Sequence, residues 1–395
     1  MKIKSKVTRI SIILAAMAAG SFLFIAMLYA GDRSKGPLED VMNTVSLQVT
    51  KVEKRIMKGD DKETRTESLS WLGKYRKSIA LAKSPDTILL GAFDNDTRES
   101  YESIVSLEDS LNTKLPLIQQ YSAWGSKTDQ VFPAIRIQAI WDLGSLPLIT
   151  WEPWMDDFDP VTFPELNKGT NKNLGGMKAI AEGKFDKYID KWASSAKEFG
   201  HPFYLRFGHE MNDPYRYPWG PQNNKPEEYI AAWKHVVNRF KTLGATNAIW
   251  VWAPHPAYTN YASYYPGNDY VDFIATTALN YGNVAQWSKW YSFDETFNKF
   301  YKDFSFYGKP IMITEFGTLN VGGDRAKWYK EALALIPQKY PVVKSVLFFH
   351  NAADKTTTYK SLDWSFKEDK AVVDAIKQSL SLWKQPKKSL GKKMG

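Results

Sequence analysis

The chain has 395 residues, 44% of them hydrophobic, which allows one large domain or two ordinary ones. It has no cysteine, so disulfides, thiolate nucleophiles and cysteine-ligated metals are excluded. The net charge of +9 comes from the ends: residues 2–9 carry four positive side chains and residues 384–393 carry five, so the body between them is formally neutral. This distribution gives no sign of a nucleic-acid-binding surface.

Residues 10–30 form an uncharged run of 21 residues that follows the positive N-terminus. About 20 apolar residues span a bilayer, and positive charge before a span predicts a cytoplasmic N-terminus. A cleaved signal peptide has a shorter apolar core and a small-x-small cleavage site, which residues 28–30 match poorly. We therefore expect a single-pass membrane anchor, with a cleaved signal peptide as the alternative. In both cases the rest of the chain lies outside the cytoplasm, anchored to the cell membrane or secreted.

Residues 31–86 are charged and favour helix, because apolar side chains recur there at spacings of three and four. We expect two helices that form a stalk, or a brace on the domain that follows, with a solvated spacer as the alternative. One domain is expected at 87–383, and residues 384–395 form a basic tail.

From residue 87 onward, apolar strand patterns alternate with amphipathic helix patterns. Strands are predicted at 88–93, 116–121, 146–150, 203–208, 248–253, 272–277, 310–314 and 343–349. Helices are predicted at 97–113, 128–143, 184–199, 226–243, 287–305, 325–336 and 368–383. Eight strands separated by helices predict the α/β class and a parallel (β/α)8 TIM barrel, whose functional sites lie at the C-terminal strand ends.

Two of these strands end in a glutamate. Glu210 follows the strand at 203–208, and Glu315 follows the strand at 310–314. A buried carboxylate is costly unless it is paired or used, and two carboxylates that flank a sugar are the catalytic pair of a glycoside hydrolase. A retaining enzyme needs them about 5–5.5 Å apart. Carboxylates that point away from each other, or either one held beneath the surface by a guanidinium, would end the case for hydrolysis.

A family resemblance is carried by Leu205–Asn212 together with Tyr217–Gly220. These segments resemble the signature of glycoside hydrolase family 26, which contains β-mannanases, mixed-linkage β-glucanases and related retaining endo-glycanases. Further agreement extends the resemblance over 87–383, at residues 148–154, 250–254, 264–272 and 313–317.

The resemblance implies residue roles. Glu210 would be the acid/base and Glu315 the nucleophile, His209 would support the subsite of cleavage, and no cofactor would be required. The remaining substrate-binding candidates are Arg206, Trp151, Trp154, Tyr215, Trp219, Asn280, Tyr281 and Phe348. Rim packing is the alternative for the tryptophans. His209, His255 and His350 fall at strand ends but lack the local spacing of a zinc site, so no metal is expected.

The sequence also departs from the family pattern. Leu279 stands where the family has a tyrosine that supports the nucleophile, and Tyr281 is a possible substitute. Phe348 replaces a tryptophan that stacks on the reacting sugar. Tyr215 or Arg216 replaces another tryptophan. These changes bear on the substrate more than on the reaction.

We therefore expect a monomeric retaining endo-β-glycanase that acts on a β-1,4-linked polysaccharide, either β-mannan or mixed-linkage β-1,3-1,4-glucan. The first alternative is a membrane-tethered, weakly active or inactive glycan-binding protein that works with exopolysaccharide synthase machinery. The second is glycan transfer instead of hydrolysis.

Overall fold

The computed structural model describes residues 65, 67–95, 101–159, 161, 163, 173–284, 289–355 and 361–383. The predicted anchor at 10–30, most of the predicted stalk and the basic tail at 384–395 lie outside these residues. Among the residues described, no helix has the length and apolar character needed to cross a membrane.

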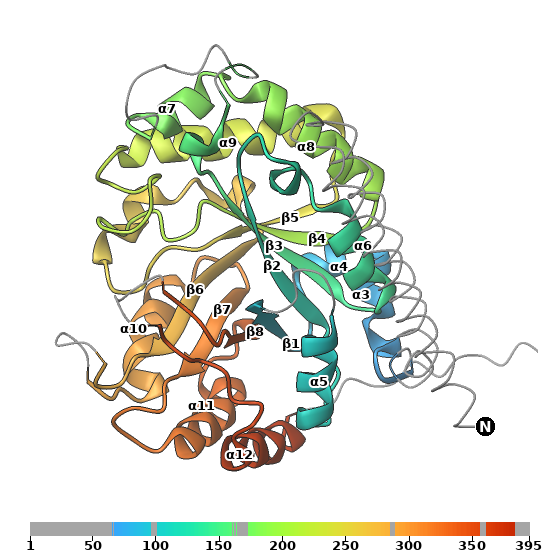
Figure 1. The fold of residues 1–395 in the computed structure, drawn as a ribbon, viewed down its shortest axis with the longest axis vertical. Coiled ribbons are helices and arrows are strands. Elements are labelled where there is room, and N and C mark those ends of the chain that lie inside the picture. Colours follow the sequence, from blue (N-terminus) through green and yellow to red (C-terminus); the bar gives the residue numbers. More distant parts are fainter. Residues whose placement is uncertain are drawn as a thin grey trace, which may run out of the picture. The chain divides into compact units, whose positions relative to one another are not determined.

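Eight parallel strands close into a barrel in sequence order, with helices around them (Figure 1). The strands are β1 (Leu89–Asp94), β2 (Leu117–Ala123), β3 (Leu146–Glu152), β4 (Phe203–Phe207), β5 (Ala248–Trp252), β6 (Phe273–Asn280), β7 (Ile311–Thr318) and β8 (Val343–His350). Each overlaps one predicted strand, so the predicted (β/α)8 barrel is confirmed.

The longer helices also overlap their predicted segments, and one short helix was not predicted. The helices that follow β1 are α5 (Glu102–Leu111), α6 (Ala134–Asp142), α7 (Gly176–Ala181), α8 (Asp186–Phe199), α9 (Pro226–Leu243), α10 (Phe293–Phe304), α11 (Arg325–Lys339) and α12 (Lys370–Ser381). The unpredicted helix is α7, which has only six residues. Between β5 and β6 the chain makes 3-10 turns, at Thr259–Tyr264 and Asn268–Tyr270.

Local sequence explains where these helices begin and end. Helix α9 has Pro226 at its first turn, where no intrahelical N–H is needed, and it ends at Gly244 in the left-handed region. Helix α10 begins with a capping box, in which the Ser292 side chain accepts from the Glu295 amide and the Glu295 side chain accepts from the Ser292 amide.

The N-terminal end of the barrel is closed by the chain segment just before β1. This segment folds into η2 (Ser70–Leu72), α3 (Gly73–Lys77) and α4 (Ile79–Lys83). Its Leu72 and Tyr75 are buried in one apolar cluster with the first residues of several strands. The Tyr204 hydroxyl, from inside the barrel, donates a hydrogen bond to the Ala82 carbonyl at 2.8 Å. Polar side chains are thereby left to the opposite, C-terminal end of the barrel.

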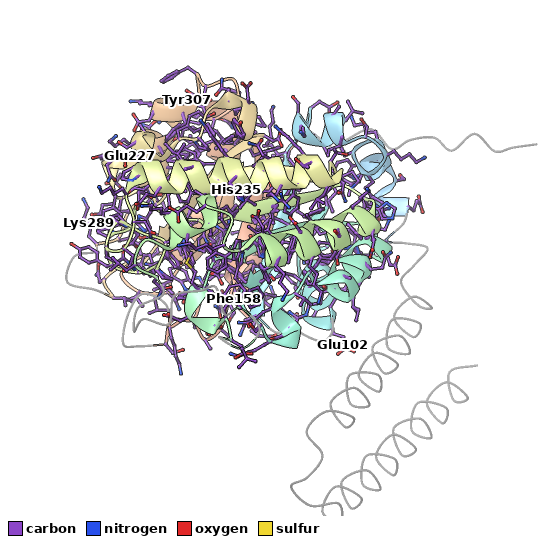
Figure 2. The ribbon with its side chains drawn as sticks, turned by 90° about the horizontal axis from the view of Figure 1, so that it is seen from above. Glu102, Phe158, Glu227, His235, Lys289 and Tyr307 are labelled. Atoms are coloured by element: carbon purple, nitrogen blue, oxygen red, sulfur yellow. The ribbon has the colours of Figure 1, made fainter. Side chains whose placement is uncertain are left out.

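The helical layer is tied together by ion pairs. Figure 2 shows α9 lying across the barrel, with Glu227 and His235 marking it. His235 Nε2 lies 2.6 Å from Asp186 Oδ1 on α8. One turn further along α9, Arg239 Nε donates to Asp190 Oδ1 at 2.8 Å and lies 3.7 Å from Asp186 Oδ2.

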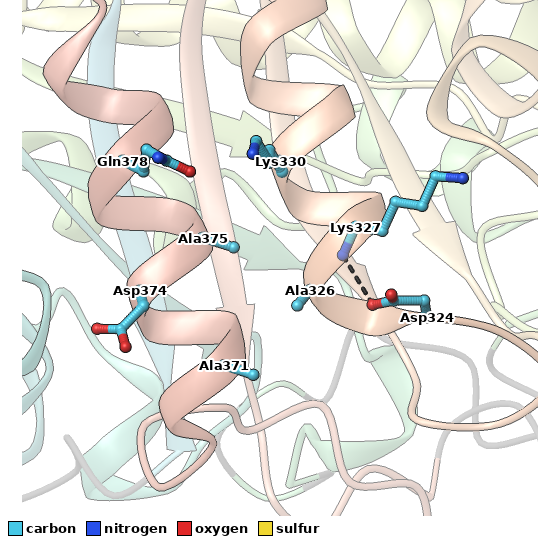
Figure 3. Close-up of a pocket in the computed structure, with 8 residues that line it drawn as sticks. All are labelled: Asp324, Ala326, Lys327, Lys330, Ala371, Asp374, Ala375 and Gln378. Atoms are coloured by element: carbon cyan, nitrogen blue, oxygen red, sulfur yellow. Dashed lines mark hydrogen bonds between the residues drawn. The ribbon is translucent and has the colours of Figure 1, made fainter.

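A shallow groove runs between α11 and α12 on the outer layer (Figure 3). Its floor consists of alanines, and Lys327, Lys330 and Asp374 are among its rim residues. All of its lining residues belong to the two helices or to the cap of α11, so the groove is separate from the carboxylates at the strand ends.

Candidate active site

Both predicted glutamates lie at the C-terminal end of the barrel. Glu315 is within β7, and Glu210 is three residues beyond the end of β4. Both are largely buried, with 8% and 3% of their surfaces exposed. Buried carboxylates need hydrogen-bond donors or positive charge nearby, so the partners of each decide what it can do.

A β-bulge turns Glu315 toward the barrel interior. The pairing of β6 with β7 runs from Thr276 opposite Ile313 directly to Thr277 opposite Glu315, which leaves Thr314 as an extra residue. Neighbouring residues of a regular strand point to opposite faces, whereas here the side chains of Thr314 and Glu315 both contact the same buried arginine. Bulges that re-aim a side chain are common beside active sites.

One oxygen of Glu315 is held by two donors. Tyr121 on β2 donates its hydroxyl proton to Glu315 Oε1 at 2.7 Å, and Arg206 Nη2 donates to the same atom at 2.9 Å. No described residue is seen to donate to Glu315 Oε2. Burial, followed by the charge of Glu315, raises the pKa of Tyr121 well above its usual range, so the phenol keeps its proton.

Arg206 is fixed from several sides and is fully buried. Its Nε donates to Thr150 Oγ1 and its Nη1 to Thr314 Oγ1, both at 2.8 Å. Burial opposes its charge, but Tyr121, Glu315 and Glu210 outweigh that effect and raise the pKa of Arg206. It is therefore a permanent cation, and its Nη2 lies 2.9 Å from Glu315 Oε1.

Glu210 has an unusual backbone conformation. Its φ of +52° lies in the left-handed region, and its amide donates to the Ala253 carbonyl at 2.7 Å. Residues other than glycine rarely adopt this conformation, and those that do cluster at functional sites. The side chain accepts from Arg216 Nη1 at 3.2 Å through Oε2, and from Thr277 Oγ1 at 3.4 Å through Oε1.

Shared neighbours show that the two glutamates converge. Thr277 pairs with Glu315 across the β6–β7 ladder, and its hydroxyl contacts Glu210. Both carboxylates also contribute to the raised pKa of Arg206. Glu210 and Glu315 therefore both lie close to Thr277 and Arg206, and the space between them is the candidate active site.

A third carboxyl group borders this space. Glu152 ends β3, and its Oε2 accepts from Trp154 Nε1 at 3.3 Å. Exclusion of water raises the pKa of Glu152 to about 7; the Trp154 bond and Arg206 oppose this rise, and Glu315 and Glu210 add to it. Glu152 is therefore partly protonated near neutral pH.

His209 is buried beneath the loop that follows β4. Its Nε2 lies 3.1 Å from the Tyr217 hydroxyl. Burial lowers the pKa of His209 well below its usual range, and the charges of Arg206 and Arg216 lower it further. The ring is thus neutral at physiological pH.

Two predicted sugar platforms are wrong because their rings point out of the barrel. Trp151 is fully buried against α8, with its ring 4.3 Å from that of Trp192. Phe348 is fully buried against α11 and packs on Tyr329 and Phe316. In both strands the adjacent residue faces the C-terminal opening instead: Glu152 on β3 and Phe349 on β8.

Two further predicted contacts are also buried. Trp219 is stacked 4.7 Å from Tyr217, and its Nε1 donates to the His209 carbonyl at 2.6 Å. Asn280 donates to Thr318 Oγ1 at 3.0 Å and accepts from the amides of Gly282 and Tyr291. These side chains support the loops around the site and are not accessible to a polymer.

The other candidates lie at or near the rim. Trp154 is half-buried, with its ring 5.3 Å from that of Trp219. Tyr281 is half-buried and packs edge-on to Trp364 at 5.0 Å. Tyr215 is 83% exposed, and its ring lies 6.3 Å from that of Tyr258.

Tyr121 is the functional side chain that the sequence did not reveal. It supplies a hydroxyl to Glu315, the role that was expected of a residue on β6 and for which Tyr281 was considered. The sequence around Tyr121 gives one indication of its role: it lies two residues after Gln119, so both polar side chains are on the same face of β2.

A cation could in principle be held near Glu210. Oxygens of Glu210 and Asp213 and a ring nitrogen of His255 lie within 4.8 Å of one another. Arg216 already contacts both carboxylates, at 3.2 Å and 3.7 Å, and supplies the positive charge that they require.

A (β/α)8 barrel with two buried glutamates near the C-terminal ends of β4 and β7 has the architecture of a glycoside hydrolase. A sequence model of glycosyl hydrolase family 26 matches residues 154–305. The chain belongs to this family.

Curated relatives include an endoglucanase H from Acetivibrio thermocellus, 32% identical over 293 residues, which are 72% of this chain and 29% of that protein. Another is a mannan endo-1,4-β-mannosidase from Caldalkalibacillus mannanilyticus, 23% identical over 71% of this chain and 55% of its own length. The chain thus spans about a third to about half of these relatives.

Solved structures with the same fold include GH26C from Muricauda sp. MAR_2010_75, with a TM-score of 0.56 and 17% identity over 81% of this chain and 93% of that one. The mannanase man26 of Bacillus subtilis has a TM-score of 0.51 and 20% identity over 79% and 90% of the two chains. At these identities the likeness concerns the fold.

Proposed function

We propose that this protein is a retaining endo-β-glycanase. The observation that carries the proposal is the convergence of Glu210 and Glu315 on one polar space, with Glu315 Oε1 held by Tyr121 and Arg206. Two donors on Oε1 stabilise an ionised carboxylate and orient its other oxygen, Oε2, for attack on a sugar.

The reaction proceeds in two displacements. Glu315 Oε2 forms a bond to the anomeric carbon while the glycosidic C–O bond breaks, and Glu210 gives its proton to the departing oxygen. Glu210 then takes a proton from water, whose oxygen attacks the same carbon and releases Glu315.

The sequence analysis expected a buried guanidinium on either glutamate to count against hydrolysis. The Arg206 contact on Glu315 does not. That expectation was too strict, because a carboxylate can accept hydrogen bonds from a guanidinium on one oxygen and attack through the other. A guanidinium obstructs a carboxyl group that has to donate a proton, and Arg216 makes such a contact with Glu210.

The substrate we propose is a β-linked polysaccharide, with mixed-linkage β-1,3-1,4-glucan placed before β-mannan. The order follows the higher identity to the endoglucanase than to the mannosidase, 32% against 23%. Exposed Tyr215 and half-buried Trp154 are the rings that we expect to stack on sugars at the rim.

The test is hydrolysis of mixed-linkage β-glucan, β-mannan and β-xylans by the full chain, with Glu315→Gln beside it. We expect a loss of at least about 1,000-fold in kcat for Glu315→Gln, because no covalent intermediate forms without the carboxylate. Glu331→Gln, on the exposed face of α11, is the matched control. Full activity of Glu315→Gln on the preferred polymer would refute the assigned role.

A second candidate function is glycan binding without turnover, in a protein tethered to the membrane through residues 10–30 and serving exopolysaccharide synthesis or export. It is favoured by the Arg216 contact on Glu210 and by Leu279, which stands where the family has a tyrosine. Retention of one polymer without product release would support this function over hydrolysis.

A further inference from the structure

Arg216 lies between two carboxylates on the loop that follows β4. Its Nη1 is 3.2 Å from Glu210 Oε2, and its Nε is 3.7 Å from Asp213 Oδ2. The nearest oxygens of these two carboxylates are themselves within 4.8 Å of one another. One guanidinium is therefore shared between Glu210 and a second carboxylate close beside it.

Arg216 is also more exposed to solvent than the other arginine of the site. Its side chain is 21% exposed, whereas that of Arg206 is fully buried. Burial opposes its charge, but Glu210, Tyr217 and Tyr281 outweigh that effect and raise the pKa of Arg216. A guanidinium stays protonated in proteins, so Arg216 is a fixed charge in this site.

The two steps of hydrolysis make opposite demands on this contact. To act as an acid, Glu210 has to point an O–H bond at the glycosidic oxygen, but its Oε2 already accepts from Arg216 and its Oε1 accepts from Thr277. To act as a base, Glu210 has to be a carboxylate, and the guanidinium then stabilises it. The contact between Arg216 and Glu210 therefore favours the second step and obstructs the first.

We propose that Arg216 is a positioning residue that moves from Glu210 to Asp213 when the leaving-group sugar enters, and returns to Glu210 for the attack of water. This inference rests on the proposed role of Glu210 as acid/base. In the first step the proton goes from Glu210 to the departing oxygen while Arg216 is paired with Asp213. In the second step Glu210, again beside Arg216, accepts a proton from water.

The test separates the two steps with two substrates. One is an oligosaccharide of the preferred polymer, whose leaving oxygen needs the proton. The other is its 2,4-dinitrophenyl glycoside, whose leaving group departs without one. For the aryl substrate, kcat/KM reports the first step without acid help, and kcat reports the second step, which needs the base.

Asp213→Asn removes the alternative partner of Arg216 and keeps an Oδ1 acceptor for the Tyr215 amide, which is 2.8 Å away. Arginine then stays on Glu210, so we expect kcat/KM on the oligosaccharide to fall about tenfold while kcat/KM on the aryl glycoside stays within about twofold.

Arg216→Ala should have the opposite signature. We expect kcat/KM on the oligosaccharide to rise at least about threefold and kcat on the aryl glycoside to fall about tenfold, because the base loses its cation. Arg216→Lys should recover most of the kcat on the aryl glycoside. The double variant Asp213→Asn/Arg216→Ala should behave like Arg216→Ala alone. The matched control is Arg239→Ala, since Arg239 also bridges two aspartates but lies on α9 in the helical layer.

Each result decides between explanations. Parallel losses in all parameters for both variants would show that the loop is merely structural and would overturn the proposal. A loss of oligosaccharide kcat/KM in Arg216→Ala would show that Arg216 stays on Glu210 throughout, which also overturns it. Hydrolysis by the wild type in either case leaves the proposed function intact. Absence of hydrolysis by the wild type overturns the proposed function, and this role with it.

Discussion

Glu152 provides a stability test whose sign follows from the structure. Its pKa in the folded protein is raised from an ordinary value of 4.5 to about 7. A carboxyl with a raised pKa holds its proton more tightly in the folded state, so the folded state loses stability as pH rises between these two values. Below about 4.5 the group is protonated in both states and contributes no difference.

The size of the effect follows from the same two values. Each pKa unit corresponds to about 1.36 kcal/mol, so the rise from 4.5 to about 7 sets an upper bound of about 3.4 kcal/mol above pH 7. Glu152→Gln removes the charge and keeps an oxygen that accepts from Trp154 Nε1. We expect the variant and the wild type to be equally stable at pH 4 and the variant to be more stable at pH 8.

The assay is thermal unfolding of both proteins from pH 4 to pH 9, with Glu331→Gln as a surface control. At about 2–4 °C per kcal/mol for a large domain, the upper bound corresponds to a melting temperature about 7–14 °C higher for the variant at pH 8. A difference in melting temperature that is the same at both ends of the range would refute the reasoning. So would a wild type that gains stability over the variant as pH rises.

Three further predictions follow from contacts within the barrel. Tyr121→Phe removes one of two donors to Glu315 and should lower kcat about tenfold with little change in melting temperature; an unchanged kcat would contradict its role. Trp151→Ala should lower the free energy of unfolding by about 3–5 kcal/mol without raising KM relative to kcat, because the ring packs against Trp192; a selective rise in KM would restore it as a platform. Tyr215→Ala should raise KM several-fold while stability stays within about 0.5 kcal/mol, since the ring is 83% exposed; a large drop in melting temperature would show a structural role instead.

Periodicity was enough to predict the barrel. Its strands are short apolar runs separated by amphipathic helices, and both patterns arise from local burial that repeats along the chain. The positions of Glu210 and Glu315 followed as well, because polar residues that directly follow a buried strand are carried to the C-terminal opening of a parallel barrel.

Periodicity could not decide which side chains of a strand point inward. Both faces of a barrel strand are covered, so both are apolar and the alternation gives no direction. Trp151 was therefore assigned to the opening, and Phe348 was assigned there because it stands where the family has a tryptophan, although both rings pack against the helices. A bulge adds a second difficulty, since the extra residue at Thr314 shifts the register immediately before Glu315.

The sequence by itself determined the fold, the family and the two glutamates, because these depend on residues that are close together in the chain. Only the tertiary structure decided what surrounds the glutamates. Tyr121 reaches Glu315 across 194 residues, and Arg206 reaches it across 109. Contacts between such distant residues depend on barrel closure and strand register, which leave no pattern in the sequence around either partner.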